Sequence, residues 1–192
     1  MPRITLDAQI MTDEQRAACA EVVSGPRGKI PSPMIAWLQN PELARRGQQL
    51  GEVLRFQTSL EPDLVELVIL FTARHWTAHQ VWTSHRRYAL QYGIDEWVIE
   101  TIAAGMAPVF TKPRDQIVYD VSKALLEQRR VSDALYARAN AEFGERGVVE
   151  LVAIIGYYCL VAMTANAFEL GLPENRAAEL RDPQFMGVAV EL

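Results

Sequence analysis

The segment Asp63–Tyr92 contains no glycine or proline, the two residues that most readily interrupt a helix. Its first part, Leu64–Phe71, is rich in apolar residues with helical spacing. The apolar spacing weakens near His75–Thr77, and Gly93 follows the end of the segment. We therefore predict that this central segment is helical, with a kink near His75–Thr77.

Helix start and stop signals recur along the rest of the chain and predict an all-α fold. Thr12 and Gln15 have the spacing of a capping box, and Asn40 followed by Pro41 is a strong helix start. Helices are expected over about 12–24, 34–38, 40–56, 95–104, 114–130, 132–143 and 148–170, and a strand only at Gly187–Leu192. We predict one domain over residues 1–192, with an N-terminal helix and loop at 1–30 and a C-terminal tail at 172–192.

The tetrapeptide VELV occurs twice, at 65–68 and at 149–152, each time after an amphipathic segment. This pattern is consistent with a fold of two similar helical halves. In such a fold Glu150 is the counterpart of Glu66, but no histidine follows Glu150. Only the first half then carries a candidate site.

Charge and composition argue against several classes of protein. The net charge of -5 is unlike that of a general nucleic-acid binder, which is usually basic. The start of the sequence lacks the apolar region of a signal peptide, and the apolar run Leu151–Met163 is too short to span a bilayer. Cys19 and Cys159 lie far apart and form no CxxC motif. We expect a cytoplasmic protein with no nucleic-acid or membrane partner.

All three histidines of the chain, His75, His79 and His85, lie in the central segment. Histidine is the side chain best suited to move a proton near neutral pH. Glu66 precedes His85 by 19 positions, and a carboxylate bonded to one ring nitrogen would fix the tautomer and raise the basicity of the other. The alternative is that Glu66 pairs with an arginine and His85 is only structural.

His75 and His79 have the i, i+4 spacing of a metal-binding pair. Trp76, however, stands where the HExxH motif requires a glutamate, and no nearby Asp, Glu or Cys completes an obvious ligand set. We therefore expect no metal and no other cofactor. Whether these two histidines are functional or structural stays open.

The central segment resembles the core of the carboxymuconolactone decarboxylase family, which includes the alkyl hydroperoxidase D-like (AhpD-like) proteins. The peroxidase branch of that family carries a glutamate, a CxxC motif and a histidine. Glu66 and His85 fall at the glutamate and the histidine, whereas Ala78 and Val81 occupy the two cysteine positions. The sequence Trp82–His85 is typical of the cysteine-free members. The resemblance covers roughly residues 30–175.

The resemblance implies an all-α fold that assembles as a trimer or hexamer. It also implies a cofactor-free lyase, of the decarboxylase type, or an isomerase acting on a small organic acid or lactone. Glu66 and His85 would be the catalytic pair, with His85 as general acid. The candidates for binding a small anionic substrate are Arg74, His79, Trp82 and Arg86.

Two other functions remain under consideration. A non-catalytic helical oligomer that binds a ligand or a partner would also explain the missing cysteines. Thiol peroxidase activity of the AhpD or peroxiredoxin type is disfavoured, because Ala78 and Val81 replace both thiols that such a reaction needs.

The family pattern also predicts the geometry of the site. If the chain bends as expected, Glu66 should contact His85 at the inner end of a largely apolar pocket, with Trp76 or Trp82 as a wall. Burial would lower the pKa of the histidine and a neighbouring carboxylate would raise it. We expect the carboxylate to dominate, which would leave His85 protonated near neutral pH.

Overall fold

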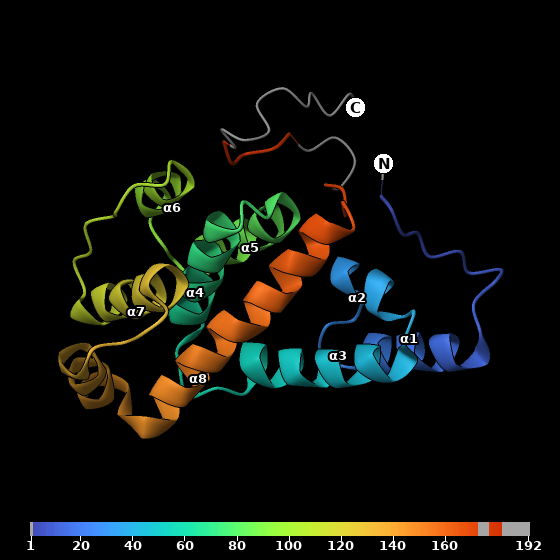
Figure 1. Cartoon of the computed structure of the whole chain (residues 1–192), viewed down its shortest axis with the longest axis horizontal. Coiled ribbons are helices and arrows are strands. Elements are labelled where there is room, and N and C mark those ends of the chain that lie inside the picture. Colours follow the sequence, from blue (N-terminus) through green and yellow to red (C-terminus); the bar gives the residue numbers. More distant parts are fainter. Residues whose placement is uncertain (1, 173–176, 182–192) are drawn as a thin grey trace.

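The computed structural model describes residues 2–172 and 177–181, and every regular element among them is a helix (Figure 1). The helices are α1 (Asp13–Ser24), α2 (Ser32–Trp37), α3 (Pro41–Phe56), α4 (Pro62–His75), α5 (His79–Gln91), α6 (Glu96–Ala103), α7 (Pro113–Lys123), a short π-helical turn η1 (Ala124–Gln128) and α8 (Asp133–Ala167). The predicted all-α fold is confirmed. The strand expected at Gly187–Leu192 lies outside the described residues.

The first helices begin where their capping residues predict. The Thr12 side chain accepts a hydrogen bond from the Gln15 backbone, and the Gln15 side chain accepts one from the Thr12 N–H, which completes the capping box. The Asn40 side chain accepts a hydrogen bond from the Leu43 N–H at the start of α3. Each bond satisfies an N–H group that has no partner within its own helix.

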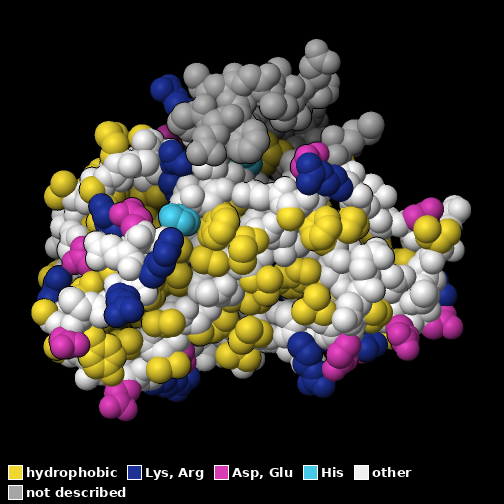
Figure 2. All heavy atoms as spheres, in the orientation of Figure 1, with side chains coloured by type: hydrophobic (Ala, Val, Ile, Leu, Met, Phe, Trp, Pro, Cys, Tyr) yellow, Lys and Arg dark blue, Asp and Glu magenta, His cyan; other side chains and the backbone are white. Residues whose placement is uncertain are grey.

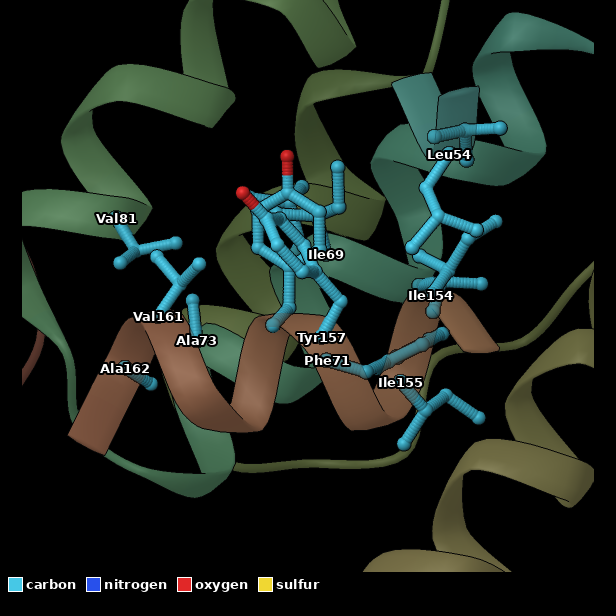
Figure 3. Close-up of a cluster of buried hydrophobic side chains, with 14 of the residues drawn as sticks. Leu54, Ile69, Phe71, Ala73, Val81, Ile154, Ile155, Tyr157, Val161 and Ala162 are labelled. Carbon is cyan, nitrogen blue, oxygen red and sulfur yellow. The ribbon is translucent and has the colours of Figure 1, made fainter. Parts of the chain in front are cut away.

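Helix α4 is the centre of the fold. It contacts α3, α5, α6, α7 and α8, and its residues are buried continuously from Leu64 to Ala73. Figure 3 shows side chains of α3, α4, α5 and α8 meeting in the core, among them Leu54, Ile69 and Ile154. A helix that is apolar on all sides is stable only when neighbours cover it, so α4 is held rigidly from several directions.

The predicted kink is a complete break between α4 and α5. The Thr77 N–H bonds to the Arg74 carbonyl and the Ala78 N–H to the Ala73 carbonyl, which is the Schellman pattern of a helix C-terminus. Thr77 has the left-handed φ of 46° that this pattern requires, an unfavourable conformation for a β-branched residue. The turn sends α5 back along α4, and this reversal builds the site described below.

Helix α8 consists of two helices that meet at Gly144, where φ is 67° and the helical conformation is interrupted. The boundary predicted between a helix ending at about residue 143 and the next helix is therefore confirmed. The second part crosses the molecule and packs on α4 (Figure 1). By length and composition α8 could cross a membrane, but 56% of its apolar window is buried inside the fold, as in the core helix of a soluble protein.

The second VELV copy has a different setting from the first. Glu66 is buried in α4, whereas Glu150 of α8 accepts hydrogen bonds from the backbone and hydroxyl of Ser59 and pairs with Arg146. The Ser59 and Arg146 contacts lower the pKa of Glu150 against the opposing effect of burial. Glu150 therefore links the loop before α4 to α8.

Candidate active site

Glu66 and His85 are in direct contact. The His85 Nδ1 atom lies 2.6 Å from Glu66 Oε2, and both side chains are buried. Glu66 is held in the continuously buried part of α4, and His85 lies on α5. The chain reversal at Trp76–Ala78 brings the two together across 19 positions. The contact between Glu66 and His85 that the family pattern predicts is therefore present.

The hydrogen bond fixes the tautomer of His85. A carboxylate can only accept a hydrogen bond, so Nδ1–H of His85 donates to Glu66. Nε2 is then the nitrogen whose lone pair is available to accept a proton. His85 also packs edge-on against the Tyr158 ring, with the ring centroids 5.1 Å apart, and this contact restricts the plane of the imidazole.

Arg55 shares the Glu66 carboxylate. Its Nη2 atom lies 3.5 Å from Glu66 Oε1, the oxygen that His85 does not use. Burial would lower the pKa of Arg55, but Tyr158, Glu66 and Tyr88 together raise it, so the guanidinium stays charged. From the sequence, Glu66 was expected to pair either with His85 or with an arginine. The carboxylate contacts both, since one oxygen faces His85 and the other faces Arg55.

The expected protonation of His85 is wrong. Burial is the largest single effect and lowers the pKa of the imidazole. Together with the positive charges of Arg55 and Arg27 it outweighs the charge and the hydrogen bond of Glu66, which raise this pKa. The folded protein therefore holds His85 as a neutral imidazole near neutral pH. A neutral imidazole begins a reaction as a base, not as the acid predicted from the sequence.

His85 lines a pocket of about 1000 Å³ that lies between α3, α5, α8 and the loop before α2. Val81, Tyr88, Tyr157 and Tyr158 contribute to its wall. Neither Trp76 nor Trp82 lines it, so the expected tryptophan wall is absent. The pocket is also more highly charged than predicted, because several arginines line it.

Arg27 and Tyr157 meet beside this pocket, at a position where α3 has no side chain. A Cβ atom added to Gly51 would collide with the Tyr157 hydroxyl and the Arg27 guanidinium. Burial raises the pKa of the Tyr157 hydroxyl, although Arg27 and Arg55 oppose this effect. The Tyr157 hydroxyl is therefore a neutral hydrogen-bond donor. Glycine at position 51 lets the loop before α2 approach α3 and α8 closely.

Two of the four predicted substrate-binding residues serve the scaffold instead. Arg74 does not line the pocket, because its guanidinium bonds the Thr77 hydroxyl at 3.3 Å and lies close to Gly105. Trp82 is buried in the core, and its indole N–H donates to Glu179 at 3.1 Å.

The other two predicted substrate-binding residues lie nearer the site. Arg86 lines the pocket, but its guanidinium is paired with three carboxylates, Glu96, Glu100 and Glu179. His79 lies in the first turn of α5 and is not part of the pocket wall. Arg86 is thus largely committed to α6 and to Glu179.

The residues that sequence reasoning missed are Arg27, Arg55, Tyr88, Tyr157 and Tyr158. They come from a loop and three helices that are far apart in the sequence, so only the packed fold brings them together. One sequence signal was available. Arg27 lies in the Gly- and Pro-rich GPRGKIPSP loop, and loops carry a large share of binding residues.

The positions of the two family cysteines are close to the site but carry no thiol. Val81 lines the pocket one helical turn before His85, and Ala78 is buried at the start of α5. Cys19 and Cys159 lie on α1 and α8, outside the pocket wall. Burial raises the pKa of both thiols, which disfavours the reactive thiolate form.

Metal binding has no evident site among residues 2–172 and 177–181. No group of three or more His, Cys, Asp or Glu side chains in this part of the chain is arranged to hold an ion. His75 and His79 are on opposite sides of the break between α4 and α5, so they do not share the regular helical spacing assumed from the sequence. Independence of metal stays a prediction.

Comparison with solved structures defines the fold as AhpD-like. An AhpD-core, peroxidase-related protein from Ralstonia eutropha JMP134 superposes with a TM-score of 0.75 at 16% identity, over 90% of this chain and 93% of its own. A peroxidase-related protein from Silicibacter sp. TM1040 gives 0.71 at 16% identity over the same shares. The debrominase Bmp8, bound to 2,3,4-tribromopyrrole, gives 0.66 at 11% identity over 89% and 91%.

No family model matches the sequence, and no protein of curated function matches it. The structural likeness, at these low identities, is a likeness of fold. It confirms the AhpD-like, all-α architecture that the central segment predicted. The reaction has to be argued from the chemistry of the pocket.

Proposed function

We propose that this protein is an enzyme that moves a proton on a small organic acid or lactone, with His85 as the general base and Glu66 as the residue that orients it. The single observation that carries this proposal is the buried 2.6 Å contact between Glu66 and His85 at the wall of a pocket. Buried acid–base pairs beside a pocket are typical of catalytic sites.

The first step uses the free nitrogen of His85. Nε2 accepts a proton from a carbon next to a carbonyl group, and the electron pair of the broken C–H bond moves into an enolate. Glu66 stabilises the imidazolium that forms, because the carboxylate already accepts the Nδ1–H bond. In a substrate with a β,γ double bond the enolate is a dienolate, so the imidazolium returns its proton to the γ-carbon. The double bond then lies between the α- and β-carbons, which completes an isomerisation without any cofactor.

Isomerisation fits the resting state of His85 better than decarboxylation does. Loss of carbon dioxide leaves a carbanion that must receive a proton, so it requires a histidine that begins protonated. The lowered pKa of His85 favours the neutral form instead. A lyase of the decarboxylase type remains the related reaction that the same groups can perform when the substrate itself brings negative charge near the imidazole.

Thiol peroxidase activity has less support. Two structural neighbours are described as peroxidase-related, but here Ala78 and Val81 carry no sulfur and both cysteines have a raised pKa.

A pocket lined by His85 favours catalysis over a purely structural histidine. A debrominase with the same fold binds a small heterocycle, which supports a small cyclic ligand for this pocket as well.

We further propose that the protein is a cytoplasmic homo-oligomer. Exposed apolar residues form a stripe along one face of α8, at Val149, Val152, Leu160 and Met163. Leu43, Leu50, Val53 and Phe56 add exposed apolar area on α3. Figure 2 shows hydrophobic side chains gathered across the middle of the face that α8 crosses. Such contiguous surfaces are typical of subunit contacts.

Hydrogen exchange in D₂O tests the proposed chemistry without knowledge of the product. A panel of small keto acids, unsaturated acids and lactones is incubated with the enzyme, and loss of C–H signal is followed by NMR. We expect exchange with the wild type, its abolition in His85→Ala, and a reduction of about 10²–10⁴-fold in Glu66→Gln. Exchange that is unchanged in His85→Ala would refute the proposal.

A further inference from the structure

The pocket carries an excess of positive charge in a protein whose net charge is negative. Among its described lining residues, the cations are Arg27, Lys29, Arg55, Arg86 and Arg87, and Glu179 is the one acid. The whole chain has a formal charge of -5. A local field opposite in sign to the net charge concentrates anions at that place.

The cations differ in whether carboxylates already pair with them and in how exposed they are to solvent. Arg86 is paired with Glu96, Glu100 and Glu179 and has little capacity for a further anion. Lys29 and Arg87 are exposed at the mouth, where solvent screens them. Arg27 and Arg55 remain as the cations of the pocket interior.

Both interior guanidiniums have unused donors. Nε and Nη2 of Arg27 and Nε of Arg55 are buried and make no hydrogen bond of ordinary geometry within the described part of the chain, although the Arg27 guanidinium interacts with the Tyr157 hydroxyl and that of Arg55 with Tyr88. The side chain of Arg55 is only 11% exposed, and a single carboxylate, Glu66, lies within ion-pair distance of it. Buried donors without partners are rare in folded proteins, because each one costs free energy.

Both charges also act on the catalytic pair. Arg27 and Arg55 each lower the pKa of His85, and each opposes the rise in the pKa of the Tyr157 hydroxyl. The two guanidiniums therefore lie within electrostatic range of the imidazole that would take the proton. An anion bound between them would lie beside His85.

We propose that Arg27 and Arg55 form the binding site for a carboxylate group of the substrate, with the Tyr157 hydroxyl beside them as a neutral donor. This assignment rests on the proposed function for the choice of substrate, but not for the existence of the anion site. It replaces the arginines that the sequence suggested, Arg74 and Arg86, which the fold commits to other partners.

The wall of the pocket favours a carboxylate over a phosphate. A planar guanidinium binds two oxygens of either group with two parallel hydrogen bonds, so the arginines alone do not decide between them. The apolar wall around Val81, Phe56 and Val161 suits the carbon skeleton of an organic acid. Held in this way, the substrate presents its carbon atoms to Nε2 of His85, and the positive charges stabilise the enolate that forms.

Binding of benzoate and its uncharged analogue benzamide tests the carboxylate site directly. The two probes have nearly the same shape and differ in charge. We measure binding to the full-length protein by calorimetry near neutral pH. Benzoate should bind the wild type, and benzamide should bind at least roughly tenfold more weakly, because it cannot make charge-assisted hydrogen bonds to arginine.

Arg27→Gln is the principal variant, because Arg27 lies in a loop and its loss leaves no buried carboxylate unpaired. It should weaken benzoate binding roughly tenfold or more. Arg46→Gln is the matched control on the exposed face of α3, and it should bind benzoate as the wild type does. Arg55→Lys keeps the charge beside Glu66 and should weaken benzoate through loss of the planar donor pair.

Several results would overturn the assignment. One is a wild type that fails to bind benzoate, binds benzamide equally well, or binds inorganic phosphate more tightly than benzoate. Unchanged benzoate binding in Arg27→Gln would count in the same way.

The assay also separates this inference from the proposed reaction. Benzoate binding that persists in His85→Ala supports the anion site even if no turnover is found. Turnover that depends on His85 but is unaffected by Arg27→Gln would refute the anion site alone.

Discussion

His85 Nδ1 and Glu66 Oε2 lie 2.6 Å apart although the two residues belong to different helices. The contact exists because the turn at Thr77 ends α4 and returns the chain along it. Burial of the pair keeps His85 neutral, and Glu66 determines which ring nitrogen carries the proton.

Gly51 should be essential for the shape of the pocket. In Gly51→Ala the added methyl group would collide with Tyr157 and Arg27, so we expect a loss of about 1–3 kcal/mol in the free energy of unfolding. Gly171→Ala, after the end of α8 and outside its apolar stripe, is the control, because nothing lies within 4 Å of its added Cβ. The control should change the free energy of unfolding by no more than about 0.5 kcal/mol. Urea unfolding measures both, and equal effects would contradict this packing.

The stability of the protein should depend on the protonation of His85. Its folded pKa is depressed, so the unfolded chain binds more protons than the folded chain in mild acid. The stability contributed by His85 is therefore fully present above about pH 6.5 and is lost as the pH falls through the folded pKa. Between about pH 7 and about pH 5, the free energy of unfolding should fall more steeply in the wild type than in His85→Gln. Parallel pH profiles would rule out the depressed pKa.

How far the sequence could predict this structure depends on how local each determinant is. The first residues of α1 and α3 are determined by the capping residues Thr12, Gln15 and Asn40, which act within one helical turn. Both helix starts were predicted correctly. The contact of Glu66 with His85 followed from a family pattern. The fold supplies the rest, since Arg27 and the tyrosines come together only through tertiary packing.

The protonation of His85 was missed for a related reason. A carboxylate neighbour can be inferred from a motif, but the depth of burial depends on how α3, α5 and α8 pack over the pair. Arg74 was assigned to the site because it lies near the histidines in sequence. The turn at Thr77 instead directs it to the Thr77 hydroxyl.

The protein should have no dithiol-dependent peroxidase activity. Ala78 and Val81 replace the reactive thiols, and burial raises the pKa of Cys19 and Cys159. Hydroperoxide consumption is assayed with a dithiol reductant in the wild type and in the Cys19→Ser/Cys159→Ser variant. Both should remain at the background rate. Turnover in the wild type that disappears in the variant would show that these cysteines are catalytic.

The apolar stripe of α8 should hold subunits together. Light scattering at micromolar concentration should show an oligomer, with a trimer or hexamer as the expected size. Val152→Lys with Leu160→Lys places two charges in the stripe and should release smaller species. Val109→Lys changes an exposed valine between α6 and α7, outside α3 and α8, and should leave the assembly intact. A wild-type monomer would refute the proposed assembly.

The pKa of His85, measured by NMR titration, tests the central claim most directly. The chain has three histidines, so the signal of His85 can be assigned by comparison with a His85→Gln variant. We predict a pKa below the ordinary value of about 6.5 and a proton on Nδ1 in the neutral form. In Glu66→Gln the pKa of His85 should fall further, because the carboxylate opposes the effect of burial. A pKa above about 6.5, or one that does not respond to Glu66→Gln, would contradict the assignment of His85 as a neutral base oriented by Glu66.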